Sequence, residues 1–190
     1  MPTAEIPSEW VYPVQATLEE LYYGVTQRYR ITRHLLNGKT RDLFIDLEIL
    51  PGFKKGTKIR FAGVGNERVN ARPQDVVFVI EEAAHPHFTR EGSTLRVMNV
   101  ELDLIEALTG DGKMLKRIRG LGGEDILVPI PPAVVRPGDM TRVPGAGMPM
   151  RRGGKVVGKG DLIVHWTIAF PGKISKIKRD ALRAALMMPA

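Results

Sequence analysis

Residues 18–24 read Leu-Glu-Glu-Leu-Tyr-Tyr-Gly, and residues 104–110 repeat this pattern as Leu-Ile-Glu-Ala-Leu-Thr-Gly. Two further pairs of segments follow in the same order. Gly-Thr-Lys-Ile-Arg-Phe-Ala-Gly-Val-Gly at 56–65 aligns with Gly-Asp-Met-Thr-Arg-Val-Pro-Gly-Ala-Gly at 138–147, and Asp-Val-Val-Phe-Val-Ile at 75–80 aligns with Asp-Leu-Ile-Val-His-Trp at 161–166. Segments repeated in one order indicate two similar modules in tandem rather than a solenoid, which needs more copies.

Length and composition agree with a duplicated domain. A chain of 190 residues suits one or two domains, and a module of about 80–90 residues can hold a modest core. The chain is 43% hydrophobic and 26% charged, as expected for a globular protein. It has no apolar run long enough to span a membrane, and residues 1–10 lack the apolar core of a signal peptide.

The net charge of +7 favours an acidic partner, such as nucleic acid, an anionic lipid or an acidic peptide tail. The basic residues are scattered among 21 acidic ones, and no aromatic platform for stacking bases is visible. We therefore expect neither nucleic acid nor a membrane as a partner.

Apolar and polar residues alternate along much of the chain, which predicts half-buried antiparallel strands. Val25, Tyr29 and Ile31 alternate with arginines and threonines, and a second alternating run covers 43–49. Asn-Gly at 37–38 predicts a hairpin between these runs, because both residues tolerate positive φ.

Two short helical turns are expected at the repeated element. Thr17 and Asp103 are suitable N-caps, and Gly24 and Gly110 are suitable residues to end the turns.

The last residues change to a helical period. Ser175 is a suitable N-cap, and Pro189 ends the pattern. The apolar residues that recur at spacings of three and four are Ile174, Ile177, Ala181, Leu182, Ala185 and Leu186. This pattern predicts an amphipathic helix that needs a partner surface. Two partners remain open at this point: the second module of the same chain, or a second subunit.

A search for catalytic or metal-binding residues finds none. The chain has no cysteine, which excludes disulfides, thiolate metal sites and cysteine catalysis. His85 and His87 lack the further ligands of a zinc site, and the Gly-Val-Gly at 63–65 is a turn rather than a phosphate loop. We expect no metal, no cofactor and no enzymatic activity.

The strand at 25–36 carries an apolar face near several arginines, a surface that suits an extended peptide added as a strand. Most of these apolar residues are nevertheless expected to fill the core, because one face of each strand must be buried.

The chain resembles the C-terminal substrate-binding region of the DnaJ-type J-domain co-chaperones over roughly residues 11–187. The segments that carry the resemblance are 17–24, 51–61, 75–80, 85–92 (His-Pro-His-Phe-Thr-Arg-Glu-Gly), 104–110, 143–149 (Val-Pro-Gly-Ala-Gly-Met-Pro), 160–164 and Phe170-Pro171. The absence of Cys-x-x-Cys-x-Gly-x-Gly repeats makes it similar to the class B members.

The resemblance implies a mainly β fold of two tandem, similar β-sandwich-like modules with short helical turns and a C-terminal amphipathic helix. The expected boundaries are 11–92 for a peptide-binding module, 93–172 for the second module and 173–188 for a dimerisation helix. No His-Pro-Asp triplet of a J domain occurs, so we expect a fragment of a longer protein. The segment 112–125 departs from the family pattern, which predicts a different structure there.

The function implied is that of a co-chaperone, binding unfolded client polypeptides and the acidic Glu-Glu-Val-Asp tail of the seventy-kilodalton heat-shock chaperone. A cytoplasmic setting is implied, and a ciliary or flagellar one is compatible with it. The alternative is a structural assembly module that keeps the fold and the dimer but does not bind clients.

The resemblance also assigns residues to each role. The apolar trough for the peptide is expected from Tyr12, Val14, Tyr29, Ile31, Leu43 and Phe78. The basic rim for the acidic tail is expected from Gln27, Arg28 and Arg30, with glutamine where a lysine is common. The homodimer is expected to form through Ile174, Ile177, Leu182 and Leu186.

Overall fold

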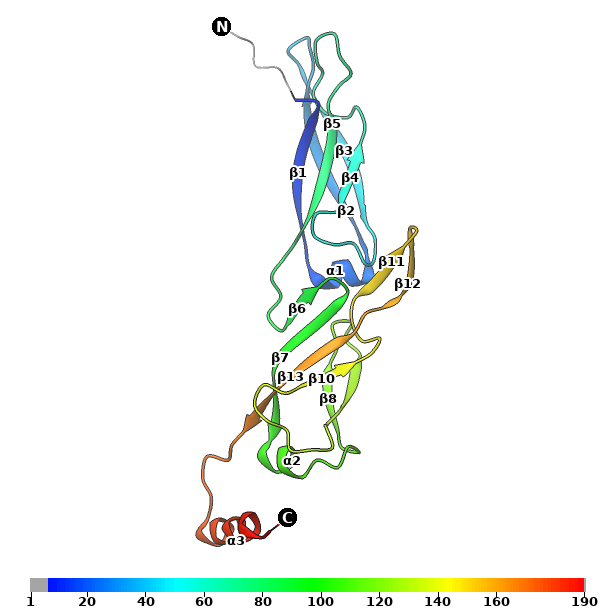
Figure 1. Ribbon diagram of the computed structural model, residues 1–190. Helices are drawn as coiled ribbons and strands as arrows, with labels where there is room; N and C mark the ends of the chain where they lie inside the picture. The colour runs from blue at the N-terminus through cyan, green and yellow to red at the C-terminus, as the bar shows by residue number, and fades with distance from the viewer. Residues whose placement is uncertain (1–6, 190) are drawn as a thin grey trace.

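The computed structural model describes residues 7–189 as an elongated molecule with two β modules end to end and a helix at the far end (Figure 1). The first module contains β1 (Glu9–Ala16), α1 (Leu18–Tyr23), β2 (Val25–His34), β3 (Thr40–Ile49), β4 (Lys58–Phe61) and β5 (Asp75–Glu82). The second contains β6 (Phe88–Glu91), β7 (Thr94–Asp103), α2 (Leu104–Thr109), β8 (Leu115–Arg119), β9 (Asp125–Pro129), β10 (Met140–Val143), β11 (Pro149–Arg152), β12 (Lys155–Lys159) and β13 (Leu162–Ala169). The chain continues into α3 (Lys176–Met187).

The predicted repeat is confirmed at the level of strand order. The first module pairs its strands in the order β1-β5-β4, and the second repeats that order as β7-β13-β10, with β6 added on the other side of β7. A separate hairpin faces each sheet, β2–β3 in the first module and β8–β9 in the second. The predicted fold class, two similar mainly β modules followed by a C-terminal helix, is therefore confirmed.

The expectation of purely antiparallel strands is wrong at one place in each module. β1 runs parallel to β5, and β13 runs parallel to β7. Between the two partners the chain passes through a helix, a hairpin and a third strand, and in the second module also through the hairpin β11–β12. It thereby returns to the end of the sheet from which it started. Parallel pairing needs such a long crossover, and alternation within one strand does not reveal it.

The hairpin of the second module is shorter than that of the first. Its strands β8 and β9 have five residues each, whereas β2 and β3 have ten. We predicted that the first module extends to residue 92, but β6 pairs with β7, so residues 88–91 belong to the second sheet.

The caps of the two short helices follow the sequence only in part. The Thr17 hydroxyl accepts the Glu20 backbone N–H at 3.2 Å, and the Thr17 backbone N–H donates to the Glu20 carboxylate at 2.9 Å. Gly24 ends α1 at φ 82°, as a glycine there allows. Gly110 was expected to play the same part after α2, but its φ is −56°, and the helix ends without a left-handed residue.

The turn at 37–38 is a hairpin turn as predicted, but only Gly38 has a positive φ, at 77°. The Gly38 N–H donates to the Leu35 carbonyl at 3.1 Å, and the Leu35 N–H donates to the Lys39 carbonyl at 2.8 Å. The Asn37 side chain instead accepts the Lys39 N–H at 3.0 Å. Asparagine therefore stabilises this turn through its side chain rather than its backbone.

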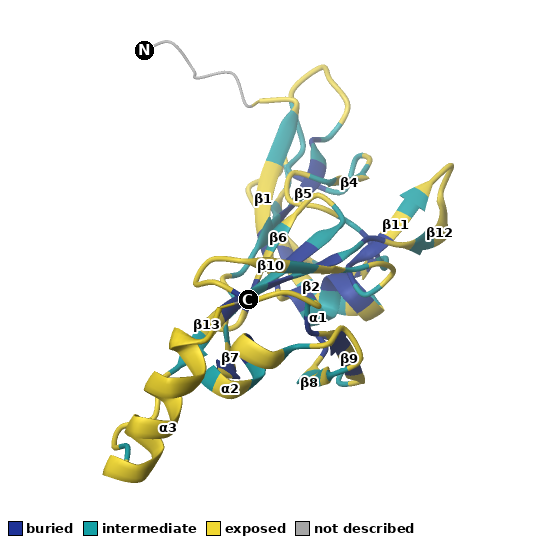
Figure 2. Cartoon of the chain, turned by 60° about the horizontal axis from the view of Figure 1, so that its bottom comes forward, coloured by how far each residue is buried: buried dark blue, intermediate teal, exposed yellow. Residues whose placement is uncertain are grey.

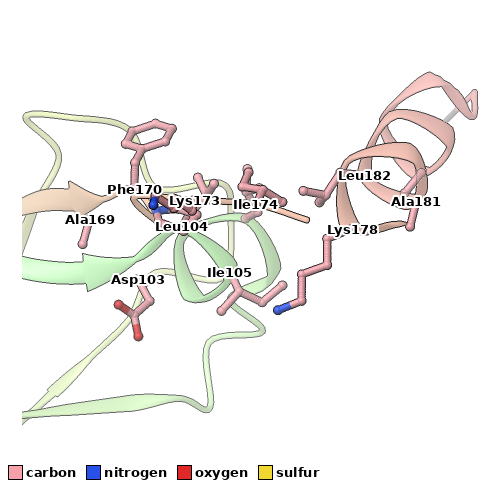
Figure 3. A pocket seen from close by; sticks show the side chains of 13 residues that line it. Asp103, Leu104, Ile105, Ala169, Phe170, Lys173, Ile174, Lys178, Ala181 and Leu182 are labelled. Carbon is pink, nitrogen blue, oxygen red and sulfur yellow. The ribbon is translucent and has the colours of Figure 1, made fainter. Parts of the chain in front are cut away.

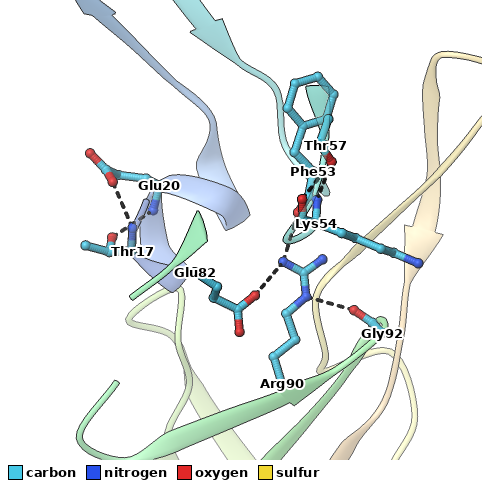
Figure 4. Close-up of polar contacts among 8 residues, drawn as sticks. All are labelled: Thr17, Glu20, Phe53, Lys54, Thr57, Glu82, Arg90 and Gly92. Carbon is cyan, nitrogen blue, oxygen red and sulfur yellow. Dashed lines mark hydrogen bonds and ion pairs between the residues drawn. The ribbon is translucent and has the colours of Figure 1, made fainter. Parts of the chain in front are cut away.

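The two modules are joined by polar contacts around α1 and β6. The Arg90 side chain is buried at this junction, where it donates to the Phe53 carbonyl at 2.9 Å and pairs with Glu82 at 3.4 Å (Figure 4). Burial lowers the pKa of Arg90, and Glu82 opposes this effect. The Tyr22 hydroxyl donates to Glu124 at 3.2 Å across the same junction.

The core runs through both modules and stops before α3, none of whose residues is buried (Figure 2). Ser175 caps this helix as predicted, since its hydroxyl accepts the Lys178 N–H at 3.3 Å. Within residues 7–189, no helix is long and apolar enough to cross a membrane.

Candidate functional site

Two partly exposed tyrosines meet on the first module. The ring centroids of Tyr12 on β1 and Tyr29 on β2 lie 5.9 Å apart in an edge-to-face arrangement. Beneath them, Phe78 on β5 lies 5.8 Å from Tyr12 and 5.1 Å from Tyr29. Tyr12 is 39% exposed and Phe78 is 0% exposed. The two tyrosines therefore form an accessible aromatic surface, here called the tyrosine trough, and Phe78 supports it from the core.

The trough lies between strands that each have a free edge. Within residues 7–189, β1 is an edge strand of its sheet, and β2 pairs only with β3. The unpaired N–H and C=O groups of such an edge can take up an added strand, and nearby side chains can then select its sequence.

A chain of hydrogen bonds fixes the Tyr29 ring. The Tyr29 hydroxyl donates to the side-chain oxygen of Gln27 at 2.6 Å, and the Gln27 amide donates to Glu20 at 2.9 Å. Glu20 is the same carboxylate that caps α1. Burial raises the pKa of the Tyr29 phenol, and the nearby Tyr12 and Glu20 act in the same direction. Tyr29 is thus a neutral donor to Gln27, and its oxygen is left as an acceptor.

The remaining residues predicted for the trough lie deeper. Val14 and Ile31 are buried in the core together with Phe78, and Leu43 is partly buried. Only Tyr12 and Tyr29 among the predicted aromatic residues therefore reach the surface.

The predicted basic rim is divided between two faces of β2. Gln27 shares the face of Tyr29, whereas Arg28 and Arg30 point to the opposite, outer face of the hairpin because successive side chains alternate. There the Arg28 guanidinium lies 5.3 Å from the Phe44 ring centroid and 3.4 Å from Asp46. Both charged side chains are mostly exposed, so the pair contributes at most about 1 kcal/mol.

Sequence reasoning missed two residues of this region. Glu20 positions Gln27, a link between α1 and β2 that only the fold creates. Phe44 is largely exposed on the outer face. Its place at an outward position of an alternating strand was a signal that could have been used, because a large exposed aromatic side chain is unusual there.

The second module has a related arrangement without the tyrosines. Ile118 pairs with Ile126 in its hairpin as Tyr29 pairs with Ile45 in the first. Lys116 forms an ion pair with Glu106 at 3.4 Å, in the place of the bond from Gln27 to Glu20. The tyrosine trough is therefore a property of the first module.

The predicted dimerisation residues lie around a second surface feature. A groove of about 670 Å³ separates α3 from α2 and the end of β13 (Figure 3). Ile174, which precedes α3, and Leu182 line this α2–α3 groove, together with Ile105 and Leu108. Ile177 and Leu186 do not line it and are strongly exposed.

The model of the DnaJ C terminal domain matches residues 10–171. The chain belongs to the DnaJ C-terminal domain family. Its similarity to class B DnaJ proteins supports a chaperone-related role for this DnaJ C-terminal region.

Among its relatives, Protein psi1 of Schizosaccharomyces pombe is 35% identical over 90% of this chain and 45% of that protein. Human DnaJ homolog subfamily B member 13 is 32% identical over 90% of this chain and 54% of that protein. Protein SIS1 of Saccharomyces cerevisiae is 30% identical over 87% of this chain and 46% of that protein. The chain therefore spans about half the length of these DnaJ relatives.

Proposed function

We propose that this DnaJ C-terminal region binds extended segments of unfolded client polypeptides in the tyrosine trough and has no catalytic activity of its own. The observation that carries the proposal is the pair of partly exposed tyrosines between two free strand edges. Membership of the family supports a chaperone setting for such a surface.

Binding follows from the chemistry of the trough. A client strand that adds to the edge of β2 gains backbone hydrogen bonds, and alternate apolar side chains pack on Tyr12 and Tyr29. The Tyr29 oxygen, which already donates its proton to Gln27, can accept a bond from the client. Short contacts of this kind suit weak, reversible binding with little sequence selectivity.

Replacing Tyr29 by serine should reduce the suppression of aggregation of a denatured client by about fivefold or more, because one aromatic wall of the trough is removed. The assay is light scattering of a chemically denatured enzyme diluted with and without this chain. Phe44→Ser is the matched control, since Phe44 is an exposed aromatic residue on the opposite face of the same hairpin. If Tyr29→Ser protects clients as well as the wild type does, the structural assembly module becomes the better description.

We also propose that the acidic C-terminal tail of the seventy-kilodalton heat-shock chaperone binds at the same edge. Side chains of an added strand alternate between the two faces of the sheet. One set would face Gln27 and Tyr29, and the other would lie beside Arg28 and Arg30, where opposite charges on neighbouring strands attract. The division of the predicted rim between two faces is compatible with this arrangement.

A peptide ending in Glu-Glu-Val-Asp should therefore bind in the micromolar range and more weakly at high salt. Arg28→Glu combined with Arg30→Glu should weaken binding by about tenfold, because two attractions become repulsions. Fluorescence anisotropy of the labelled peptide measures this. Arg117→Glu combined with Arg119→Glu is the control, on the equivalent hairpin of the second module. Binding that is insensitive to both salt and the Arg28 and Arg30 reversals would place the tail elsewhere.

We further propose that two copies pair through α3 into a V-shaped homodimer. The support is a helix with an apolar stripe and no buried residue, next to the apolar α2–α3 groove. A closed two-fold dimer buries the same stripe twice. Two troughs in one dimer could hold the same unfolded chain, which raises the effective concentration for the second contact.

A further inference from the structure

The hairpin β11–β12 is a surface that the proposed function does not use. Its two strands pair only with each other, so both of its outer edges are unpaired in the described structure. Figure 1 shows the hairpin projecting from the second module beside the lower end of the first. The first module has no equivalent, since a loop without a named strand connects β4 to β5.

Contacts with the first module hold the base of this hairpin in place. The Arg151 guanidinium donates to the Pro51 carbonyl at 3.1 Å and lies 5.5 Å from the centre of the Phe53 ring. Lys159 lies 4.7 Å from the centre of the Tyr22 ring. Gly52 has a φ of 84°, and a Cβ there would come within 2.7 Å of the Pro149 carbonyl oxygen. The turn and the hairpin are therefore packed too closely for a side chain at residue 52.

The hairpin and the turn beside it form a basic surface, here called the junction patch. Its cations are Lys54, Lys55, Arg151, Arg152, Lys155 and Lys159. Neither 50–57 nor 148–160 contains an acidic residue. None of the six cations forms an ion pair with any residue in 7–189. Lys159 donates to the Tyr22 hydroxyl, which in turn donates to Glu124.

Exposed apolar side chains lie among these charges. Val156 is 48% exposed and Val157 is 60% exposed, next to Lys155 on the same strand. A free strand edge with small apolar side chains and cations fits an extended acidic peptide, which supplies a backbone, apolar residues and carboxylates. Single-stranded nucleic acid would instead need open aromatic faces for stacking, and the Phe53 ring in this patch is covered by Arg151.

We propose that the junction patch docks an acidic, extended segment of a partner protein, which adds as a strand to the β11–β12 hairpin. The carboxylates pair with the cations of the hairpin tip on the face of Lys155, and the small apolar side chains, which point to the opposite face of the added strand, pack on Val156. This site is separate from the tyrosine trough and does not depend on the function proposed for it.

The test uses the full chain and a fluorescein-labelled peptide of alternating glutamate and valine, followed by anisotropy. Arg152→Glu combined with Lys155→Glu should weaken binding by about tenfold, because two exposed attractions become repulsions. Lys39→Glu combined with Arg41→Glu makes the same change of net charge at another exposed hairpin and should change binding by less than about twofold. Circular dichroism melting checks that all variants are folded.

One further peptide and one further variant test the mode of binding. A peptide of alternating glutamate and proline keeps the charge but loses half of its backbone N–H groups, and it should bind at least about fivefold more weakly. The Arg28→Glu and Arg30→Glu variant separates this site from the one proposed on β2, and it should still bind the glutamate–valine peptide.

Four outcomes would overturn the proposal. In the first, the glutamate–valine peptide does not bind, and in the second, the Lys39 and Arg41 control weakens its binding as much as the Arg152 and Lys155 reversals do. In the third, the glutamate–proline peptide binds as tightly as the glutamate–valine peptide. In the fourth, single-stranded DNA binds as tightly as that peptide and is equally sensitive to the Arg152 and Lys155 reversals. In the first case, the cations merely protect a strand edge from self-association.

Discussion

Replacing both Leu182 and Leu186 by aspartate should convert the proposed dimer into monomers. Leu182 is 38% exposed and Leu186 is 72% exposed in the single chain, so both can lose apolar surface to a partner. Burying one leucine side chain contributes roughly 1.5–3 kcal/mol. The double mutant loses this burial in both chains of the dimer and places carboxylates where apolar groups would meet. The dissociation constant of the dimer should therefore rise by more than about a hundredfold.

Analytical ultracentrifugation at tens of micromolar measures this change. Arg183→Asp is the control on the opposite side of α3, and it should leave the dimer intact. The melting temperature of the aspartate double mutant should stay close to that of the isolated wild-type chain, because no residue of α3 is buried within the chain. A wild-type protein that sediments as one chain, or a double mutant that sediments as two, would refute pairing through the tail.

Replacing Phe78 by alanine should destabilise the first module by about 3–5 kcal/mol, the usual cost of removing a buried phenylalanine. Phe78 is 0% exposed. Its ring centroid lies 5.8 Å from that of Tyr12, 5.1 Å from that of Tyr29 and 5.7 Å from that of Phe61. A cost of this size is a large part of the roughly 5–15 kcal/mol that stabilises a typical domain. Urea denaturation followed by tyrosine and tryptophan fluorescence measures it.

Tyr12→Ala is the matched control for this prediction, since Tyr12 belongs to the same aromatic group but is 39% exposed. It should cost about 1–2 kcal/mol, because much of its surface is already in water. Equal losses of stability in the two variants would mean that Phe78 is part of the accessible trough rather than its buried support.

Local signals in the sequence predicted several elements of the fold. Period-two alternation identified the strands at 9–16, 25–34 and 40–49, because side chains alternate faces in any strand whatever its partner. The repeat of 18–24 at 104–110 identified the second module. The tail helix was equally clear, since Ser175 and the spacing of the apolar residues are local signals.

These local signals did not indicate which strands pair with each other. Nothing in residues 9–16 indicates that this strand pairs in parallel with 75–82, because pairing depends on the path of the chain between them. For the same reason the sequence did not reveal that β6 pairs with β7.

The sequence by itself determined which residues are apolar, which face of each strand they share and where the helices begin. Only the tertiary structure decided that Phe78 and Val14 are core, that Tyr12 and Tyr29 remain partly open, and that Arg28 points away from Tyr29. The physical reason is that alternation distinguishes two faces of a strand but not how much of the inner face a second layer covers. That coverage depends on where the layer ends, and in this chain the free edges of β1 and β2 leave the two tyrosines at the surface.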